Sequence, residues 1–246
     1  MTASEAASKT AAYFDSESPT WDDRYVRQSH FRTRLETLRN WLAALPPNLS
    51  VLDFGCGTGV ASAQLASLGH RPTGVDISEK MVETSRAALQ RSGIPEDRFT
   101  FEHISPDGRG AYLEKTYDGM VSLGVFEYTD DPAALLKLLT TRIRPGGFLI
   151  MSGPNRRSPV RWMEHFVFRH PRYFAVIPGL KRLASPDSYK HYQKHQFVAG
   201  ELAALLDSCG MTLERTFYHG GPSVLGGLEH TPWLGMTMIL QFKKRP

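Results

Sequence analysis

The chain has 246 residues, a formal net charge of +4 and an apolar fraction of 41%. This length suits one large domain or a core with an added segment, and the apolar fraction excludes a chain that is disordered throughout. The weakly basic balance would suit an anionic substrate or a membrane surface, but it does not by itself indicate nucleic-acid binding.

Cysteine usage and hydropathy indicate a soluble, cytoplasmic protein. Cys56 and Cys209 have no CxxC spacing and no neighbouring metal ligands, so we expect neither a disulfide nor a structural zinc site. No apolar run reaches the roughly 18 residues of a membrane span, and the first residues, MTASEAASKT, lack the pattern of a signal peptide. The sequence gives no indication of an oligomeric state.

The region before the first predicted strand is expected to contain a lid, from Tyr13 to Tyr25, and a helix packed on the sheet, over residues 31–45. Residues 1–10 are small and polar, and we expect them to be frayed. From Trp21 to Leu45 large apolar residues recur at helical steps, which predicts a helix that ends at Pro46.

Residues 51–76, VLDFGCGTGVASAQLASLGHRPTGVD, predict a strand–helix–strand unit with a glycine-rich first turn. Glycines in the turn allow positive φ and a close approach of a ligand to the backbone. The start of the helix over 60–68 favours an anionic group, and Asp76 at the end of the second strand can accept two hydrogen bonds from a ribose diol. The unit therefore predicts a site for a nucleoside-containing ligand.

The spacing of the glycines in the turn indicates which class of nucleoside-containing ligand is expected. A dinucleotide fingerprint is G-x-G-x-x-G, whereas this turn reads D-x-G-x-G-x-G from Asp53 to Gly59, which disfavours a nicotinamide oxidoreductase. The segment DFGCGTG resembles the first motif of class I S-adenosylmethionine-dependent methyltransferases. A bare glycine triplet is also compatible with an ordinary strand-to-helix turn, so the neighbouring acids and the later motifs carry much of the resemblance.

The chain after Asp76 continues in the alternating order of that family. A helix that Ser78 can cap precedes strands over 99–104 and 117–123. Three stretches resemble the family's later motifs: GVDISEKMVETSRAAL, the VFEY that follows the second of these strands, and the RPGG turn before a strand over 147–151. The nearest subgroup is the small-molecule type typified by ubiquinone and menaquinone methylation.

The resemblance implies an α/β fold with a Rossmann-like, seven-stranded, mostly parallel sheet and helices on both faces. The last strands, over 211–217 and 234–242, would form an antiparallel hairpin. It also implies four parts in the chain: an N-terminal lid and helix (1–47), a cofactor-binding core (48–153), a helical cap inserted after the fifth strand (154–198), and the C-terminal part of the core (199–246).

The cofactor implied by the resemblance is S-adenosylmethionine, with S-adenosylhomocysteine as product. Ile77 would pack on the adenine, and residues from Tyr13 to Tyr25 would cover the cofactor. Where the family usually has an acid after the third strand, this chain has Ser105-Pro106-Asp107. The residues expected to contact the cofactor are Asp53, Gly55, Cys56, Gly57, Gly59, Asp76, Ile77, Met81, Ser105, Leu123, Tyr13, Trp21 and Tyr25.

The cap is expected to select the methyl acceptor. Its basic residues are interspersed among aromatic ones, which suits an apolar pocket rimmed by arginines, a surface resting on anionic lipid, or simply the core of the cap. Nucleic acid is the least favoured partner, because no RNA-binding module is visible. The residues expected to contact the acceptor are Tyr13, Trp162, His165, Tyr189 and Tyr192.

The candidates for a general base are His191 and His195, with Glu127, His165 and His219 behind them. His191 and His195 stand four apart and would share one face of a helix, and Glu127 follows the fourth strand. The alternatives are two exposed histidines, a structural role for Glu127, or a zinc site. No third metal ligand is evident near the two histidines, so we expect no metal.

These features predict transfer of a methyl group to an oxygen or nitrogen atom of a small or lipid-like molecule, aromatic or anionic in character. An RNA or protein methyltransferase is an alternative, although the N/D-P-P-Y-type motif of one such branch is absent. A protein that binds the cofactor without turning it over is another, although the cofactor motif is intact.

Overall fold

Within residues 3–105, 107–174, 188–221 and 227–246, which the computed structural model describes, the strands form one sheet. Its order is β3-β2-β1-β4-β5-β7-β6; β1 to β5 pair in parallel, and β7 is antiparallel to β5 and β6. The predicted mostly parallel, seven-stranded sheet is confirmed. The strands are β1 (Ser50–Phe54), β2 (Arg71–Asp76), β3 (Thr100–His103), β4 (Tyr117–Leu123), β5 (Ile143–Pro154), β6 (Met211–His219) and β7 (Thr237–Lys244).

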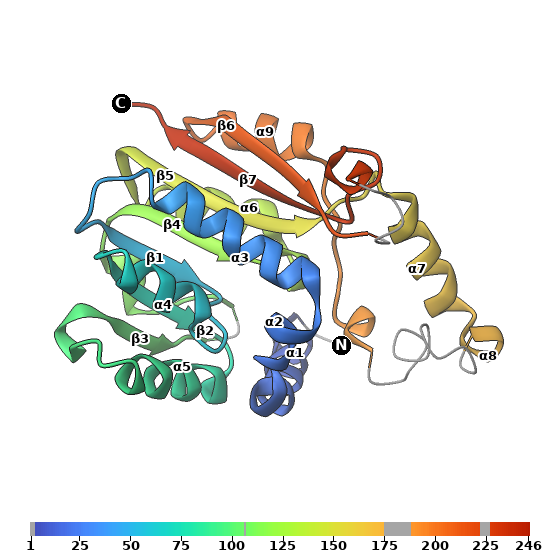
Figure 1. The fold of residues 1–246 in the computed structure, drawn as a ribbon, viewed down its shortest axis with the longest axis horizontal. Coiled ribbons are helices and arrows are strands. Elements are labelled where there is room, and N and C mark those ends of the chain that lie inside the picture. Colours follow the sequence, from blue (N-terminus) through green and yellow to red (C-terminus); the bar gives the residue numbers. More distant parts are fainter. Residues whose placement is uncertain (1–2, 106, 175–187, 222–226) are drawn as a thin grey trace.

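Helices cover both faces of the sheet, as the resemblance implies (Figure 1). Val121 and Ile150 pack with one set of helices, whereas their neighbours Met120 and Leu149 pack with the other. This alternation follows from the two-residue period of a strand, and it buries the sheet on both sides. The first set is α3 (Ser29–Leu42) and α4 (Val60–Ser67), with α5 (Glu79–Arg91) beside α4; the second is α6 (Pro132–Thr140) and α9 (Ala199–Asp207).

The topology fixes where a ligand can bind. β1 lies between β2 and β4, so the connections from the two sides diverge at its carboxyl end. Open α/β sheets bind ligands at such a switch point. Helices α1 (Ala3–Glu17) and α2 (Asp23–Arg27), with the 3-10 helix η1 (Ser18–Thr20) between them, lie at this end of the sheet (Figure 1).

Two expectations for the N-terminal region were wrong. Residues 3–10 are helical rather than frayed, because α1 docks on the core: Asp15 accepts a hydrogen bond of 2.6 Å from the Ser78 hydroxyl. The predicted single helix from Trp21 is interrupted at Gln28, whose extended backbone (ψ 113°) separates α2 from α3.

The segment between β5 and β6 contains helices, as expected for the cap. They are α7 (Pro159–Arg169), α8 (Pro171–Phe174) and, after residues that lie outside the described ranges (175–187), the 3-10 helix η5 (Tyr189–His191). The strand expected from residue 234 begins only at Thr237, after the 3-10 helix η7 (Leu228–His230). The remaining 3-10 helices are η2 (Glu96–Arg98), η3 (Ala111–Glu114) and η4 (Phe126–Tyr128).

Replacing Gly119 by alanine should destabilise the sheet. A Cβ at this position of β4 would overlap the ring of Phe148, which is buried on β5. We expect the free energy of unfolding, measured in urea, to fall by about 1–3 kcal/mol, the usual cost of overpacking a core.

Gly200→Ala is the matched control, because a Cβ at Gly200 in α9 would meet no atom within 4 Å. Alanine there should leave the stability unchanged or raise it by about 0.5–1 kcal/mol, since glycine is the weaker helix former. Equal unfolding free energies for the two variants would contradict the packing of Phe148 on β4.

Candidate functional site

The glycine turn after β1 (residues 55–59) is shaped to leave room above its backbone. Gly55, Gly57 and Gly59 all have positive φ, of 73°, 54° and 85°. A Cβ on Gly55 would overlap Val125, and one on Gly59 would lie 2.6 Å from Cβ of Ser85. A Cβ on Gly57 would meet nothing nearer than the indole nitrogen of Trp21 at 3.8 Å. Gly55 and Gly59 thus serve packing, whereas Gly57 has Trp21 as its one neighbour, at van der Waals distance.

The carboxylate of Asp76 ties the end of β2 to this turn. One oxygen accepts a hydrogen bond from the Gly57 backbone N–H (2.9 Å), and the other accepts one from the Ser78 N–H (2.9 Å). Burial raises the pKa of Asp76, and these backbone hydrogen bonds oppose that rise. The Ile77 N–H is a third backbone partner, and because a carboxylate has about four acceptor sites, the side chain can still accept a hydrogen bond from a ligand.

A cavity of about 440 Å³ lies between the glycine turn, the end of β2 and the N-terminal helices. We call it the glycine-turn cavity. Most residues expected to contact the cofactor line it: Trp21, Tyr25, Asp53, Gly55, Cys56, Gly57, Asp76, Ile77, Met81 and Leu123.

Three residues expected at the cofactor do not line this cavity. Gly59 packs on Ser85, and the Ser105 hydroxyl is bonded to Asp107, which lines the cavity in its place. Tyr13 instead stacks on Tyr192 of the cap, with ring centroids 4.4 Å apart. Their contact with a cofactor stays a prediction.

Arg34 is a residue of this cavity that the sequence analysis missed. It is buried in α3, its guanidinium lies 4.6 Å from the centroid of the Phe31 ring, and its Nε has no hydrogen-bond partner. The sequence feature that could have identified Arg34 is its position on the apolar face of a predicted helix, between Phe31 and Leu35.

A second cavity, of about 370 Å³, adjoins the first. We call it the Glu127 cavity; it lies between α3, α7, η5 and the carboxyl ends of β4 and β5. The two cavities share five lining residues, which form the junction between them: Trp21, Arg34, Leu123, Gly124 and Tyr128. The two cavities therefore meet at these five residues.

Glu127 is a buried acidic residue that lines the second cavity. Its side chain is only 7% exposed, and its Oε2 has no hydrogen-bond partner. Burial raises the pKa of Glu127 to about 7, and the positive charges of Arg34, Arg161 and Lys190 limit the rise. Both protonation states are therefore populated near neutral pH.

Two histidines line the same cavity, the buried His219 and the half-buried His30. His219 ends β6, is 1% exposed, and has no partner for either ring nitrogen. Burial lowers the pKa of His219 to about 3 and that of His30 to about 4, with help from nearby arginines. Both imidazoles are therefore neutral near pH 7 and act as hydrogen-bonding groups rather than charges.

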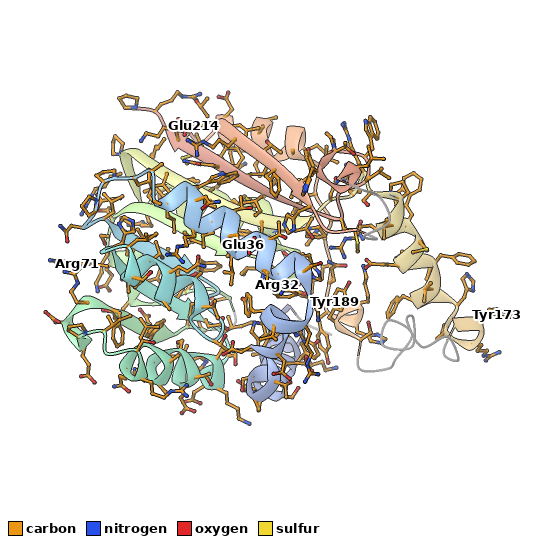
Figure 2. The ribbon with its side chains drawn as sticks, in the orientation of Figure 1. Arg32, Glu36, Arg71, Tyr173, Tyr189 and Glu214 are labelled. Carbon is orange, nitrogen blue, oxygen red and sulfur yellow. The ribbon has the colours of Figure 1, made fainter. Side chains whose placement is uncertain are left out.

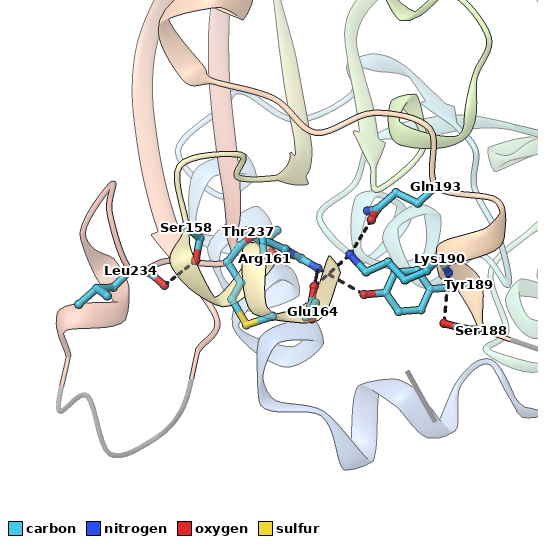
Figure 3. A network of polar contacts seen from close by, with 10 residues as sticks. Ser158, Arg161, Glu164, Ser188, Tyr189, Lys190, Gln193, Leu234 and Thr237 are labelled. Atoms are coloured by element: carbon cyan, nitrogen blue, oxygen red, sulfur yellow. Dashed lines mark hydrogen bonds and ion pairs between the residues drawn. The ribbon is translucent and has the colours of Figure 1, made fainter. Parts of the chain in front are cut away.

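A buried ion network holds the cap against the sheet (Figure 3). Glu164 of α7 binds Nη1 of Arg161 (2.8 Å) and Nζ of Lys190 (3.1 Å). Arg161 also donates from Nε to the Met236 carbonyl (2.9 Å) and from Nη1 to the Tyr189 hydroxyl (3.3 Å). Because these groups are desolvated, loss of one partner would leave an uncompensated charge. The network fixes one wall of the Glu127 cavity.

Of the residues expected to contact the acceptor, Tyr189 lines the Glu127 cavity. Trp162 is 66% exposed and donates its indole N–H to the Arg156 carbonyl, and His165 is exposed. Neither lines either cavity.

The prediction that His191 and His195 share a helical face was wrong, because the chain leaves its 3-10 helix after His191. His191 is exposed and makes an edge-type ring contact with Phe168, and neither histidine lines either of the two cavities described above. Backbone N–H groups of residues 194 and 195 instead bond the Glu127 carbonyl. The described part of the chain contains no group of side chains arranged to hold a metal. No helix in it is long and apolar enough to span a membrane.

Known proteins match both the sequence and the fold. A family model described as a methyltransferase domain matches residues 25–214. The chain is 28% identical over 211 residues to the ubiquinone biosynthesis O-methyltransferase of Xanthomonas axonopodis pv. citri, a match that covers 85% of this chain and 74% of that protein.

Two solved structures have the same fold. One is a magnesium protoporphyrin IX methyltransferase from Synechocystis with bound S-adenosylhomocysteine (TM-score 0.70, 20% identity, 97% of this chain and 99% of that one). The other is the 1,6-didemethyltoxoflavin N1-methyltransferase of Burkholderia thailandensis, bound to 1,6-didemethyltoxoflavin and S-adenosylhomocysteine (TM-score 0.66, 18% identity, 100% and 92%).

Replacing Glu127 by glutamine should change how stability depends on pH. The folded protein holds the Glu127 proton more tightly than the unfolded chain, because the pKa rises from 4.5 to about 7 on folding. This contribution to stability is complete below pH 4.5 and is lost as the pH rises through 7, by roughly 3 kcal/mol in all.

The uncharged glutamine removes this dependence. Relative to wild type, Glu127→Gln should gain stability between pH 5 and pH 8, as measured by urea unfolding at each pH. Parallel stability curves for the two proteins would show that Glu127 is not desolvated.

Proposed function

The chain belongs to the methyltransferase-domain family, and we propose that it transfers the methyl group of S-adenosylmethionine to a small molecule held in the Glu127 cavity. The observation that carries this proposal is the junction of the two cavities at Leu123 and Gly124. A cofactor in the glycine-turn cavity would present its methyl group there, within reach of an acceptor in the other cavity.

The glycine-turn cavity offers a partner for each part of the cofactor. Asp76 would accept hydrogen bonds from the ribose hydroxyls, and Ile77 would pack on the adenine. Arg34, which has an unpartnered Nε and no ion pair in the described structure, would face the carboxylate of the methionine moiety. These roles follow from the lining residues and from the chemistry of the ligand.

The bound cofactor supplies a methyl group on a positively charged sulfur, which leaves as a neutral thioether. The protein's part is chiefly to hold the two reactants in line, at roughly 3–3.5 Å, so that the step becomes effectively unimolecular. Trp21 and Tyr128 at the junction would exclude water from the reacting atoms.

Among the candidate bases, Glu127 and His219 line the proposed acceptor site. A carboxyl group whose pKa lies near 7 suits proton transfer at neutral pH. His191 and His195 stay predictions without support from the cavity lining.

A small acceptor is favoured over RNA or protein. The Glu127 cavity has the size of a small-molecule pocket and is closed on one side by the cap. The O-methyltransferase relative and the N-methyltransferase structure support oxygen and nitrogen, respectively, as the methylated atom.

Asp76→Asn should weaken cofactor binding. Loss of the charged acceptor for the ribose hydroxyls should reduce the affinity for S-adenosylhomocysteine, measured by calorimetry, by about tenfold or more. Transfer of tritium from labelled S-adenosylmethionine to a metabolite extract of the source cell should fall in parallel.

Asp97→Asn, the same change at an exposed aspartate of η2, is the control and should leave both quantities unchanged. Unchanged affinity in Asp76→Asn would remove Asp76 from its role. Absence of any binding to wild type would overturn the proposed function itself.

We also propose that the cap makes peripheral contact with a membrane, which would bring a lipid-like acceptor to the site. Trp162, Phe166 and Tyr173 are exposed large side chains on α7 and α8, and Figure 2 shows Tyr173 at the far tip of the molecule. Exposed Arg169 and Arg172 accompany them. Aromatic residues among arginines suit the interface of an anionic bilayer.

Cosedimentation with phosphatidylglycerol vesicles tests this contact. The double variant Trp162→Glu/Phe166→Glu should lose most of the binding, because it places charge where apolar side chains would enter the interface. Val26→Glu, the same kind of change at an exposed side chain of α2, should retain it. Equal binding by both variants would contradict the proposal.

A further inference from the structure

The N-terminal lid, formed by α1, η1 and α2 (residues 3–27), supplies part of the wall of both cavities. The lid side chains that line the glycine-turn cavity are Ala7, Thr10, Phe14, Trp21 and Tyr25. Trp21 and Arg24 line the Glu127 cavity. A cofactor bound in the glycine-turn cavity would therefore lie under the lid, and its release would depend on how firmly the lid is held in place.

On the cofactor side, two carboxylates hold the lid to the core. Asp15 of α1 accepts a hydrogen bond from the hydroxyl of Ser78 (2.6 Å). Asp22, just before α2, accepts one from the hydroxyl of Thr58 (2.5 Å). Ser78 caps α5, Thr58 belongs to the glycine turn, and both residues are buried. The lid thus rests on the two segments that form the proposed cofactor site.

On the side of the cap, the lid is held by a stacked pair of aromatic rings. Tyr13 of α1 and Tyr192, which follows η5, have ring centroids 4.4 Å apart and ring planes inclined by 23°. Both residues are half-buried, and their two segments, far apart in the sequence, lie side by side in Figure 1. Because a stacked aromatic pair is stabilising beyond the area it buries, this contact ties the lid to the cap.

The stacked pair continues into the lid as a row of ring contacts that ends at the glycine turn. The Tyr13 ring meets the Phe14 ring edge-on (5.3 Å between centroids), and Phe14 meets Trp21 in the same way (5.6 Å). The indole nitrogen of Trp21 lies 3.8 Å from the position of a Cβ on Gly57. Packed rings therefore connect Tyr192 to the turn that would hold the cofactor.

Tyr192 is presented by a segment that is itself anchored on both sides. Before it, the Lys190 ammonium is bound to the carboxylate of Glu164 (3.1 Å). After it, the backbone N–H groups of residues 194 and 195 donate to the Glu127 carbonyl, at 2.7 and 3.1 Å. Tyr192 lines neither of the two cavities. Its ring is therefore a fixed support for the lid rather than a group that touches a reactant.

We propose that Tyr192 is a positioning residue for the cofactor, which acts through Tyr13 to hold the N-terminal lid closed over the glycine-turn cavity. The proposal rests on the proposed function, because it takes that cavity to be the cofactor site. The cap thereby helps to retain the cofactor, in addition to forming a wall of the Glu127 cavity. Opening of the lid breaks the contact between the two rings, so loss of either ring favours the open lid.

Release of tritiated S-adenosylhomocysteine into an excess of the unlabelled compound, followed by rapid filtration, tests the proposal. The dissociation rate constant should rise about three- to tenfold in Tyr192→Ala, the factor that corresponds to one aromatic pair. Tyr192→Phe is the matched control, because it keeps the ring and should release the ligand at the wild-type rate. Tyr13→Ala should show the same rise as Tyr192→Ala and carries the test from the lid side if Tyr192→Ala fails to fold.

The double variant Tyr13→Ala/Tyr192→Ala separates this role from a merely structural one. If the two rings act through each other, the second substitution has no contact left to remove, and the double variant should release the ligand no faster than either single variant. Hydrogen exchange measured by mass spectrometry gives a second readout. The amides of α1 should exchange about three- to tenfold faster in Tyr192→Ala than in wild type, because the lid opens more often.

A wild-type release rate in Tyr192→Ala, an equal rise in Tyr192→Phe, or a double variant whose rise is the product of the two single rises would overturn the inference. In each of these cases S-adenosylhomocysteine still binds wild type, so the proposed function stands and only the role of Tyr192 is wrong. If S-adenosylhomocysteine fails to bind wild type, the inference and the proposed function fall together.

Discussion

The hydrogen bond from the Gly57 N–H to the Asp76 carboxylate joins the two halves of the site. It links residues 19 positions apart in the chain and sets the end of β2 against the turn that follows β1. The other oxygen of Asp76 bonds the Ser78 N–H, and Ser78 caps α5 and donates to Asp15 of α1. One buried carboxylate thus fixes the turn, and its neighbour Ser78 fixes the start of a helix and the docking of the N-terminal lid.

The second cavity depends on contacts of longer range. Its walls come from α3 before the sheet, α7 and η5 after β5, and His219 at the end of β6. The network of Arg161, Glu164 and Lys190 joins α7 to η5 and to the start of β7, and the stacking of Tyr13 on Tyr192 joins the N-terminal lid to the cap. Such a buried network costs desolvation, which suits a role in positioning a wall more than a role in raising stability.

This difference in range explains what could be predicted from the sequence. The sheet and the cofactor side follow from a strand, a turn and a helix that are contiguous in the chain, so Asp53, Gly57 and Asp76 could be named from this one stretch and its resemblance to the methyltransferase motif. Glu127 was found because it directly follows a strand at the same edge. A local pattern cannot show which distant segments meet, and Arg34 was therefore missed.

The errors have the same origin. A spacing of four residues between His191 and His195 predicts a shared face only if the segment is a helix. Here the N–H groups of residues 194 and 195 bond the Glu127 carbonyl, so the backbone is extended toward η4 rather than coiled. The exposed position of Trp162 likewise depends on how α7 is turned by Arg161 and Glu164, which no local pattern encodes.

The most direct measurement of the central claim is a crystal structure of the protein grown with S-adenosylhomocysteine. The ribose hydroxyls should lie within hydrogen-bonding distance of Asp76, and the sulfur should face the junction at Leu123 and Gly124. A ligand bound elsewhere, or one whose sulfur points away from the Glu127 cavity, would contradict the account.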